Sequence, residues 1–171
     1  MTVWTTRPET PEDIPAIHAL NAAAFATAAE ADLVDALRAD PDAWIDGLSL
    51  VARAPDGTLV GHALLTRCRI GTGGAPALAL APCAVLPSHQ GQGAGSAVIR
   101  AALEAARDQG ESLVVVLGHA DYYPRFGFEP ASRWGIRAPF TVPDEAMMAL
   151  VLDSDRPVPS GVIHYAAAFG V

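Results

Sequence analysis

The sequence contains no lysine, so arginine supplies all 11 basic side chains, against 19 acidic ones. The resulting net charge is −8. Proteins that bind nucleic acids present a basic face that neutralises phosphates, whereas this chain has no arginine-rich run and no interleaved aromatic and basic residues. We therefore expect no nucleic-acid partner. An acidic surface is compatible with an amine substrate, although more often it only reflects solubility.

Cysteine is scarce as well. Cys68 and Cys83 are too few for a disulfide framework and lack the spacing of metal ligands, and the histidines are scattered without paired metal spacing. No stretch approaches the roughly 20 consecutive apolar residues that cross a bilayer, and the N-terminal MTVWTTRPETPEDIP lacks the order of a secretory signal. We expect a cytoplasmic protein with no membrane partner and no metal site.

The chain has 171 residues, of which 51% are hydrophobic. This fits one globular domain, which we take as residues 1–171. Apolar spacing predicts strands at 3–8, 77–86, 112–118, 146–153 and 161–169, a hairpin over 48–70, helices at 11–25 and 30–40, a helix from Ala94 to Gly110, and a short helical or turn segment at 120–126. This order indicates a mixed α/β or α+β domain.

Three glycines, Gly91, Gly93 and Gly95, lie between a predicted strand and a predicted helix. A P-loop would continue with lysine and a dinucleotide fingerprint with a further glycine, but Ser96 and Ala97 follow. The segment is either a tight turn or a site where backbone N–H groups and a helix dipole bind a phosphate-bearing ligand.

Two motifs carry a resemblance to a known family. The stretch VLPSHQGQGAG, from Val85 to Gly95, resembles the Q/R-x-x-G-x-G/A segment of the GNAT superfamily of acyl-CoA-dependent N-acetyltransferases. The stretch YPRFGF, from Tyr123 to Phe128, resembles the Y-x-x-x-G-F segment after the fifth strand of that family. The order of predicted elements is similar over nearly the whole chain. The stretches GHADYYPRFGFEPAS and GVIHYAAAF further resemble a bacterial branch of predicted N-acetyltransferases.

This resemblance implies an α/β (α+β) GNAT fold. Its central sheet would be mixed, mostly antiparallel, with about six to seven strands flanked by helices and a V-shaped gap between the fourth and fifth strands. Acetyl-CoA would be the cosubstrate, with its pantetheine arm along Cys83, Ala84 and Val85 of the fourth strand. Its pyrophosphate would bind a glycine loop made of Gln90, Gly91, Gln92, Gly93, Ala94, Gly95 and Ser96.

The resemblance also implies a catalytic acid. Tyr123 aligns with the tyrosine that protonates the departing CoA thiolate; the alternative role is an aromatic plug in the core, and Tyr122 takes the acid role if the register is off by one. The base stays open between Glu30, which could instead serve the helix dipole, and His119, which could instead be a hydrogen-bonded histidine at a strand end.

The function implied is direct transfer of an acetyl group from acetyl-CoA to a primary amine. The alternatives are a catalytically weak acyl-CoA-binding module, an unrelated nucleotide-binding domain that prefers ATP or NAD, and transfer to oxygen or of longer acyl groups. The acceptor is a small-molecule or peptide amine that the sequence does not identify. Domains of this family often dimerise, so a homodimer through the C-terminal strands is a further expectation.

Overall fold

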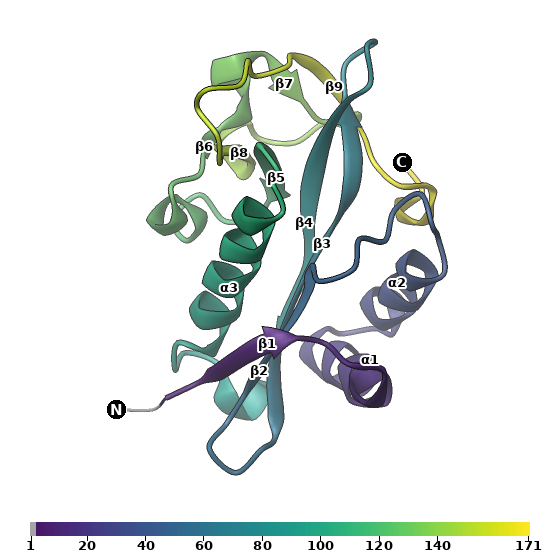
Figure 1. The fold of residues 1–171 in the computed structure, drawn as a ribbon, viewed down its shortest axis with the longest axis vertical. Coiled ribbons are helices and arrows are strands. Elements are labelled where there is room, and N and C mark those ends of the chain that lie inside the picture. Colours follow the sequence, from purple (N-terminus) through teal and green to yellow (C-terminus); the bar gives the residue numbers. More distant parts are fainter. Residues whose placement is uncertain (1–2) are drawn as a thin grey trace.

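The structure is a computed structural model that describes residues 3–171. Its sheet follows the order β1-β2-β3-β4-β5-β8-β6, with β9 pairing β3 and β7 off this path (Figure 1). The pairs are antiparallel except for β4–β5 and β7–β9. The strands are β1 (Thr5–Pro8), β2 (Ser49–Arg53), β3 (Leu59–Ile70), β4 (Ala75–Val85), β5 (Leu113–Leu117), β6 (Glu129–Pro130), β7 (Ile136–Arg137), β8 (Met147–Val151) and β9 (Gly161–His164).

Helices cover both faces of this sheet. Helix α3 (Ala94–Asp108) lies on one face, and α1 (Ile14–Ala24) and α2 (Ala29–Arg38) lie on the other (Figure 1). Successive strand residues point to opposite faces. Accordingly, Leu50 belongs to the buried cluster under α3, whereas its neighbour Val51 belongs to the cluster under α1 and α2.

The α3 sequence has the pattern of a helix that lies on a sheet. Its buried residues recur at the spacing of one helix face, and they are Ala94, Val98, Ile99, Ala102, Leu103 and Ala106. Arg100 and Glu104 lie on the exposed side. The helix begins and ends close to the predicted residues, and it holds the glycine loop against the end of β4.

The pairing of β4 with β5 is short. It joins only Leu78 to Val114 and Ala79 to Val115, although β4 continues to Val85. Beyond Leu80, β4 places Ala81 and Pro82 opposite one residue of β3, which is a β-bulge. A bulge bends its strand, and proline lacks the N–H that a ladder needs. The two strands therefore separate, as the resemblance predicts.

Within residues 3–171, the sheet has nine strands rather than the expected six to seven. The two extra ones, β6 and β7, are two residues long, too short to show a periodic pattern. The strand expected over 161–169 ends at His164 and pairs with β3 and β7 instead of closing the sheet beside β8. Alanines favour strands weakly, and Ala167–Phe169 forms a 3₁₀ turn, η6, instead.

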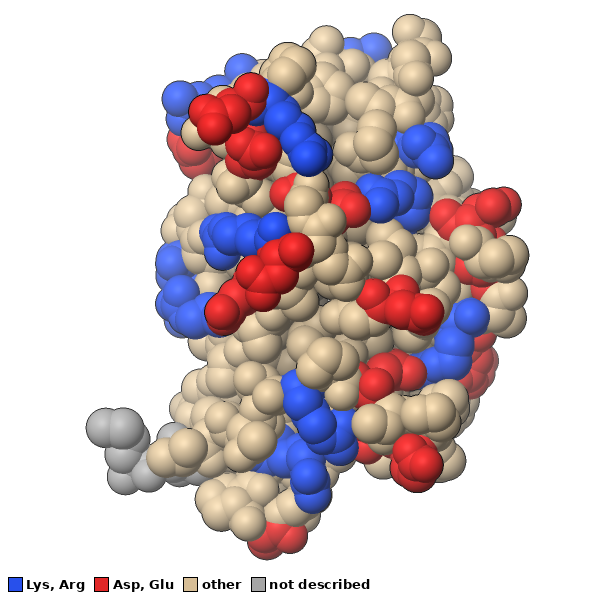
Figure 2. Space-filling view, viewed as in Figure 1, with Lys and Arg blue, Asp and Glu red and all other residues tan. Residues whose placement is uncertain are grey.

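Charges of both signs are interspersed over the face shown in Figure 2, without a continuous basic area. Within residues 3–171, no helix combines the length and apolar character needed to cross a membrane. The expectations about nucleic acids, the cytoplasm and dimerisation remain predictions.

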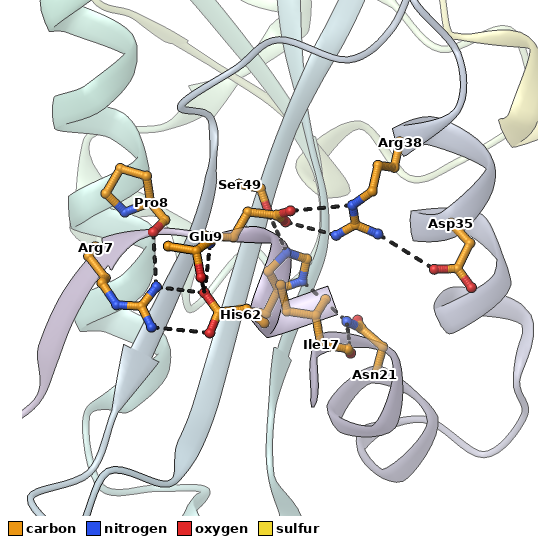
Figure 3. A network of polar contacts seen from close by, with 11 residues as sticks. Arg7, Pro8, Glu9, Ile17, Asn21, Asp35, Arg38, Ser49 and His62 are labelled. Carbon is orange, nitrogen blue, oxygen red and sulfur yellow. Dashed lines mark hydrogen bonds and ion pairs between the residues drawn. The ribbon is translucent and has the colours of Figure 1, made fainter. Parts of the chain in front are cut away.

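A polar network joins α1 and α2 to the sheet (Figure 3). Arg38 on α2 donates to the carboxylate of Glu9, at 2.8 Å between Nη2 and Oε1, and the Ser49 hydroxyl donates to the same carboxylate. The Nε2 atom of His62 lies 2.9 Å from the Ser49 oxygen, and the Asn21 amide nitrogen lies 3.2 Å from Nδ1. The Ser49 hydroxyl donates its proton to Glu9 and therefore accepts one from Nε2, whereas the Asn21 amide donates to Nδ1. We therefore assign the proton of the His62 ring to Nε2.

His62 is fully buried. This burial, together with the nearby positive charge of Arg38, lowers the pKa of the ring from 6.5 to about 3. The imidazole is therefore neutral at physiological pH. Protonating it would place a second positive charge near Arg38 and would set an Nδ1–H against the Asn21 amide nitrogen, which is itself a donor.

We predict that the free energy of unfolding falls as the pH drops below 6.5. Below pH 6.5 the unfolded chain binds a proton at His62, whereas the folded chain does not bind it until about pH 3. The free energy of unfolding therefore decreases by up to about 1.4 kcal/mol for each pH unit below 6.5. Urea denaturation at pH 7 and pH 5 measures this loss, about 2 kcal/mol. His62→Gln removes the titration, and an equally steep loss in that variant would contradict the assignment.

Candidate active site

The gap between β4 and β5 has a pocket on each face of the sheet. The first, on the α3 side, is the glycine-loop pocket, a hollow of about 280 Å³. It is lined by Val85, Gln90, Gly91, Gly93, Gly95, Ser96, Tyr122 and Arg125. Most of the residues expected to bind pyrophosphate are thus brought together at the N-terminus of α3.

The three glycines of this loop serve different purposes. Gly91 and Gly93 have φ of 74° and 91°, a region that L-residues rarely adopt. Gly93 is the N-cap of α3, where no side chain caps the helix, so first-turn N–H groups remain available to an anion. Gly95 lies within the helix, and a Cβ there would come 3.2 Å from Val85 Cγ2 and 3.5 Å from the Tyr122 oxygen.

Side chains hold the glycine loop in place. Gln90 donates to the carbonyl of Val85 at 3.2 Å, and Gln92 donates to that of Ser88 at 3.4 Å. The indole of Trp4 donates to the Gln92 carbonyl at 3.1 Å. This role of Trp4 is not predictable from local sequence, because the contact spans 88 residues.

Tyr122 and Arg125 complete the pocket opposite the loop. The hydroxyls of Tyr122 and Ser96 lie 3.1 Å apart. The Arg125 guanidinium lies 4.2 Å from the centre of the Tyr122 ring and donates to the Tyr122 carbonyl at 2.8 Å. A positive charge therefore faces the same hollow as the positive end of the helix dipole, and both favour an anion.

The far end of β4 has one free edge. Cys83, Ala84 and Val85 pair with β3, and none of the three pairs with β5. An unpaired strand edge offers N–H and C=O groups to an extended ligand. The expected pantetheine segment is therefore unpaired along one side.

Tyr123 begins the 3₁₀ turn η3 (Tyr123–Phe126) directly after the loop that follows β5. Burial, together with the neighbouring Cys83 thiol, raises the pKa of Tyr123 well above its usual range. Burial likewise raises the pKa of Cys83, to about 12, so this thiol is a weak nucleophile at neutral pH. The ring of Tyr123 also packs against Tyr122 and Phe128, at 5.1 and 5.8 Å between ring centres.

Gly118 provides the space for that ring, a role that the sequence analysis missed. A Cβ on Gly118 would lie 2.3 Å from Cε2 and 2.8 Å from Cδ2 of Tyr123. The signal available in the sequence is a glycine at the end of a buried strand, which marks a close approach to the backbone.

The second pocket, the apolar pocket, has a volume of about 270 Å³ and lies where β4 and β5 separate. Ala79 and Val115 belong to the core cluster of the face away from α3. The pocket therefore opens away from α3. It is lined by Ala79, Leu80, Ala81, Val115, Val116, Leu117, Phe140, Tyr165, Phe169 and Val171.

Neither expected base lines the apolar pocket. Glu30 lies in a neighbouring hollow of about 230 Å³ that shares Phe169 with it, and its buried Oε2 has no hydrogen-bond partner within residues 3–171. His119 is exposed, and its carbonyl accepts the N–H groups of Tyr122 and Tyr123 at 3.1 and 3.3 Å. That carbonyl shapes the turn that presents Tyr123.

One group of side chains outside this region has the composition of a metal site. His18, Asp32 and Asp35 each place one ligand atom within 4.8 Å of the others. His18 and Asp35 form an ion pair at 2.8 Å, which accounts for their closeness on the exposed surface of α1 and α2. The expectation of no metal remains a prediction.

Comparison with known proteins points in one direction. The family model described as the acetyltransferase (GNAT) domain matches residues 5–131. YjhQ of Escherichia coli strain K12, an uncharacterized N-acetyltransferase, is 43% identical over 145 residues, which cover 83% of this chain and 79% of YjhQ.

Solved structures agree. The GNAT family N-acetyltransferase YhbS from Escherichia coli, in complex with CoA, has a TM-score of 0.90 at 29% identity, with 100% of this chain and 94% of that chain covered. A GNAT family acetyltransferase from Brucella melitensis, in complex with acetyl-CoA, has a TM-score of 0.78 at 33% identity, with 98% of each chain covered. These likenesses confirm the predicted fold class.

We predict that Gly118→Ala moves the Tyr123 ring and destabilises the protein. The added methyl group overlaps the ring edge, and overpacking of this kind costs about 1–3 kcal/mol. Gly73→Ala is the matched control, because no atom lies within 4 Å of a Cβ there. Denaturation midpoints of both variants give the measurement. Equal stability of the two variants would show that the ring relaxes without cost.

Proposed function

This chain belongs to the GNAT acetyltransferase family, and we propose that it transfers an acetyl group from acetyl-CoA directly to a primary amine, as one domain over residues 1–171. The observation that carries the proposal is the gap between β4 and β5. The glycine-loop pocket lies at one end of it, and Tyr123 neighbours Cys83 on the free edge of β4.

The glycine loop receives the pyrophosphate of acetyl-CoA. The first turn of α3 supplies uncapped N–H groups, and Arg125 supplies a positive charge on the opposite side of the same hollow. The pantetheine arm follows the free edge of Cys83, Ala84 and Val85, which directs the thioester toward the point where β4 and β5 separate. A strand N–H there polarises the thioester carbonyl, as in an oxyanion site.

Tyr123 acts as the general acid. Attack of the amine on the thioester carbonyl forms a C–N bond, and collapse of the tetrahedral intermediate breaks the C–S bond and leaves the electron pair on sulfur. That sulfur needs a proton. The raised pKa of Tyr123 keeps its proton in place until then, and Cys83 of the expected pantetheine segment is one of its neighbours.

The proton of the attacking amine leaves on the other face of the sheet. Tyr165 is the one titratable side chain of the apolar pocket, and burial raises its pKa to about 12, which leaves it a donor at neutral pH. We keep Glu30 and His119 as candidate bases that act through water, since neither lines the pocket. Glu30 is the first to test because its Oε2 is unpartnered.

We predict that Tyr123→Phe lowers kcat by a factor of about 10² or more, the usual contribution of a general acid, without weakening CoA binding. Steady-state release of the CoA thiol gives kcat, and calorimetry gives the Kd of CoA. The phenyl ring preserves the packing against Phe126 and Phe128, so the fold is retained.

Tyr122→Phe is the matched comparison. It removes the hydroxyl contact with Ser96 in the glycine-loop pocket, so we expect weaker CoA binding and little change in kcat at saturating acetyl-CoA. The reverse result, with kcat lost in Tyr122→Phe and kept in Tyr123→Phe, would give the acid role to Tyr122. Full activity in both variants would overturn the mechanism.

We also predict that Arg125→Gln raises the Kd of CoA about tenfold, since a charge-assisted hydrogen bond contributes about 1.5–3 kcal/mol. In the unchanged protein, CoA at about 100 times its Kd adds roughly 2.7 kcal/mol, a shift in Tm of about 5–10 °C. ATP or NAD at the same concentration shifts it less.

Arg133→Gln is the control for loss of one surface charge. Arg133 pairs with Glu129 and is 61% exposed, outside the glycine-loop pocket. The same loss of CoA affinity in both variants would assign the effect to net charge rather than to a contact. A larger shift with ATP or NAD than with CoA would remove the basis of the proposed function.

A further inference from the structure

We infer that the apolar pocket binds the acceptor, and that the acceptor is a primary amine whose remaining group is an aromatic ring or a branched aliphatic chain without a second charge. The inference rests on the proposed function, because it makes this pocket the second substrate site of the same gap between β4 and β5. It narrows the acceptor from any amine to one chemical class.

The lining of the pocket carries no charged side chain. All ten lining residues are aliphatic or aromatic, and the one polar side-chain atom belongs to Tyr165. That hydroxyl points to the sulfur of Met147, at 3.8 Å. A second ammonium group in the pocket would therefore lose its hydration without meeting a carboxylate side chain, which is costly. The lining side chains thus disfavour polyamines and similar multiply charged acceptors.

Three aromatic rings form one wall of the pocket. Phe140 and Tyr165 are stacked, with ring centres 6.2 Å apart and 20° between their planes. The ring centre of Phe169 lies 5.3 Å from that of Tyr165. They come from three separate segments: the loop before β8, the residue after β9, and η6. Rings that converge in this way favour a flat apolar group, because aromatic pairs attract one another beyond the gain from the area they bury.

The pocket also exposes apolar surface that the fold leaves uncovered. Residues 3–171 include three large hydrophobic side chains that are clearly exposed, and two of them, Leu117 at 45% and Val171 at 64%, line this pocket. Clustered apolar exposure of this kind marks a binding site more often than scattered single residues do. The third, Val3, lies outside the pocket. It precedes β1, which is an edge strand of the sheet, separated from β4 by β2 and β3.

The volume fits a small group. A cavity of about 150 Å³ lined by apolar side chains binds benzene, so about 270 Å³ accommodates one ring with a short linker. Apolar surroundings also lower the pKa of an amine, because burial disfavours its charged form. The pocket thus promotes loss of the ammonium proton, which fits a site lined by no carboxylate side chain.

The test compares two acceptors that differ by one charge. Benzylamine presents one ring and one amine, and 4-(aminomethyl)benzylamine adds a second ammonium on the same ring. With acetyl-CoA saturating, thiol release should give a kcat/KM at least tenfold higher for benzylamine, with spermidine lower still. Equal values, or a preference for the charged acceptors, would overturn the inference.

A substitution at the pocket mouth should reverse this preference. Leu117→Asp places a carboxylate on a side chain that is already 45% exposed, so it should lower kcat/KM for benzylamine about tenfold and raise that for the diamine. Thr72→Asp, at the exposed tip of the β3–β4 hairpin, adds the same charge elsewhere and should change neither value. Identical behaviour of the two variants would overturn the inference.

Two further measurements separate failure of the inference from failure of the proposed function. Binding of benzylamine to the CoA-loaded protein, followed by saturation-transfer NMR, reports on the pocket without turnover. Binding that Leu117→Asp weakens supports the pocket even if no amine is acetylated, in which case the proposed function fails alone. Absence of binding, while other amines are acetylated, overturns the inference alone.

The competing occupant is a longer acyl chain of the donor. If the octanoyl group is transferred faster than the acetyl group, and Leu117→Asp removes this difference, the pocket holds the acyl chain rather than the acceptor. That result would overturn the inference. A rate that falls with acyl length, measured on benzylamine, supports it.

Discussion

The site depends on the interruption of one parallel strand pair. β4 and β5 are joined at only two residue pairs, and the bulge at Ala81 and Pro82 then turns β4 away. Unpaired backbone groups are costly when buried, so the gap persists only because its edges face hollows on both sides. A continued ladder between these strands would cover the free edge of the expected pantetheine segment, the space beside Tyr123 and the apolar pocket.

The two faces of the sheet divide the chemistry between them. On the α3 face, the helix N-terminus, Arg125 and the hydroxyls of Ser96 and Tyr122 form a polar, cationic hollow. On the opposite face, no charged side chain lines the apolar pocket. An anionic cosubstrate and an uncharged acceptor group would therefore approach the same gap from opposite sides. Each meets surroundings that would be unfavourable to the other.

Features encoded by neighbouring residues were predictable from the sequence. The glycine loop, the apolar face of α3, the buried strand β5 and the turn that ends at Gly127 each depend on local spacing, and the structure has them where the pattern indicated. Features made by distant segments were not. The hydrogen bond of Trp4 to the glycine loop spans 88 residues, and the apolar pocket joins β4, β5, the loop before β8 and residues after β9. Pairing of β9 with β3 depends on tertiary contacts that periodicity does not contain.

The separation of the faces also accounts for the difficulty of naming a base. Tyr123 lies in the cluster under α3, whereas Tyr165 and Phe169 lie in clusters on the other face. In the proposed mechanism, the proton donated to sulfur and the proton lost by the amine would therefore lie on opposite sides of the sheet, and no single side chain would serve both. An apolar pocket that disfavours an ammonium ion shifts part of the work of deprotonation from a side chain to the binding equilibrium. If the pocket lowers the pKa of the bound amine in this way, a base that acts through water from beyond Phe169 would be sufficient to remove the proton.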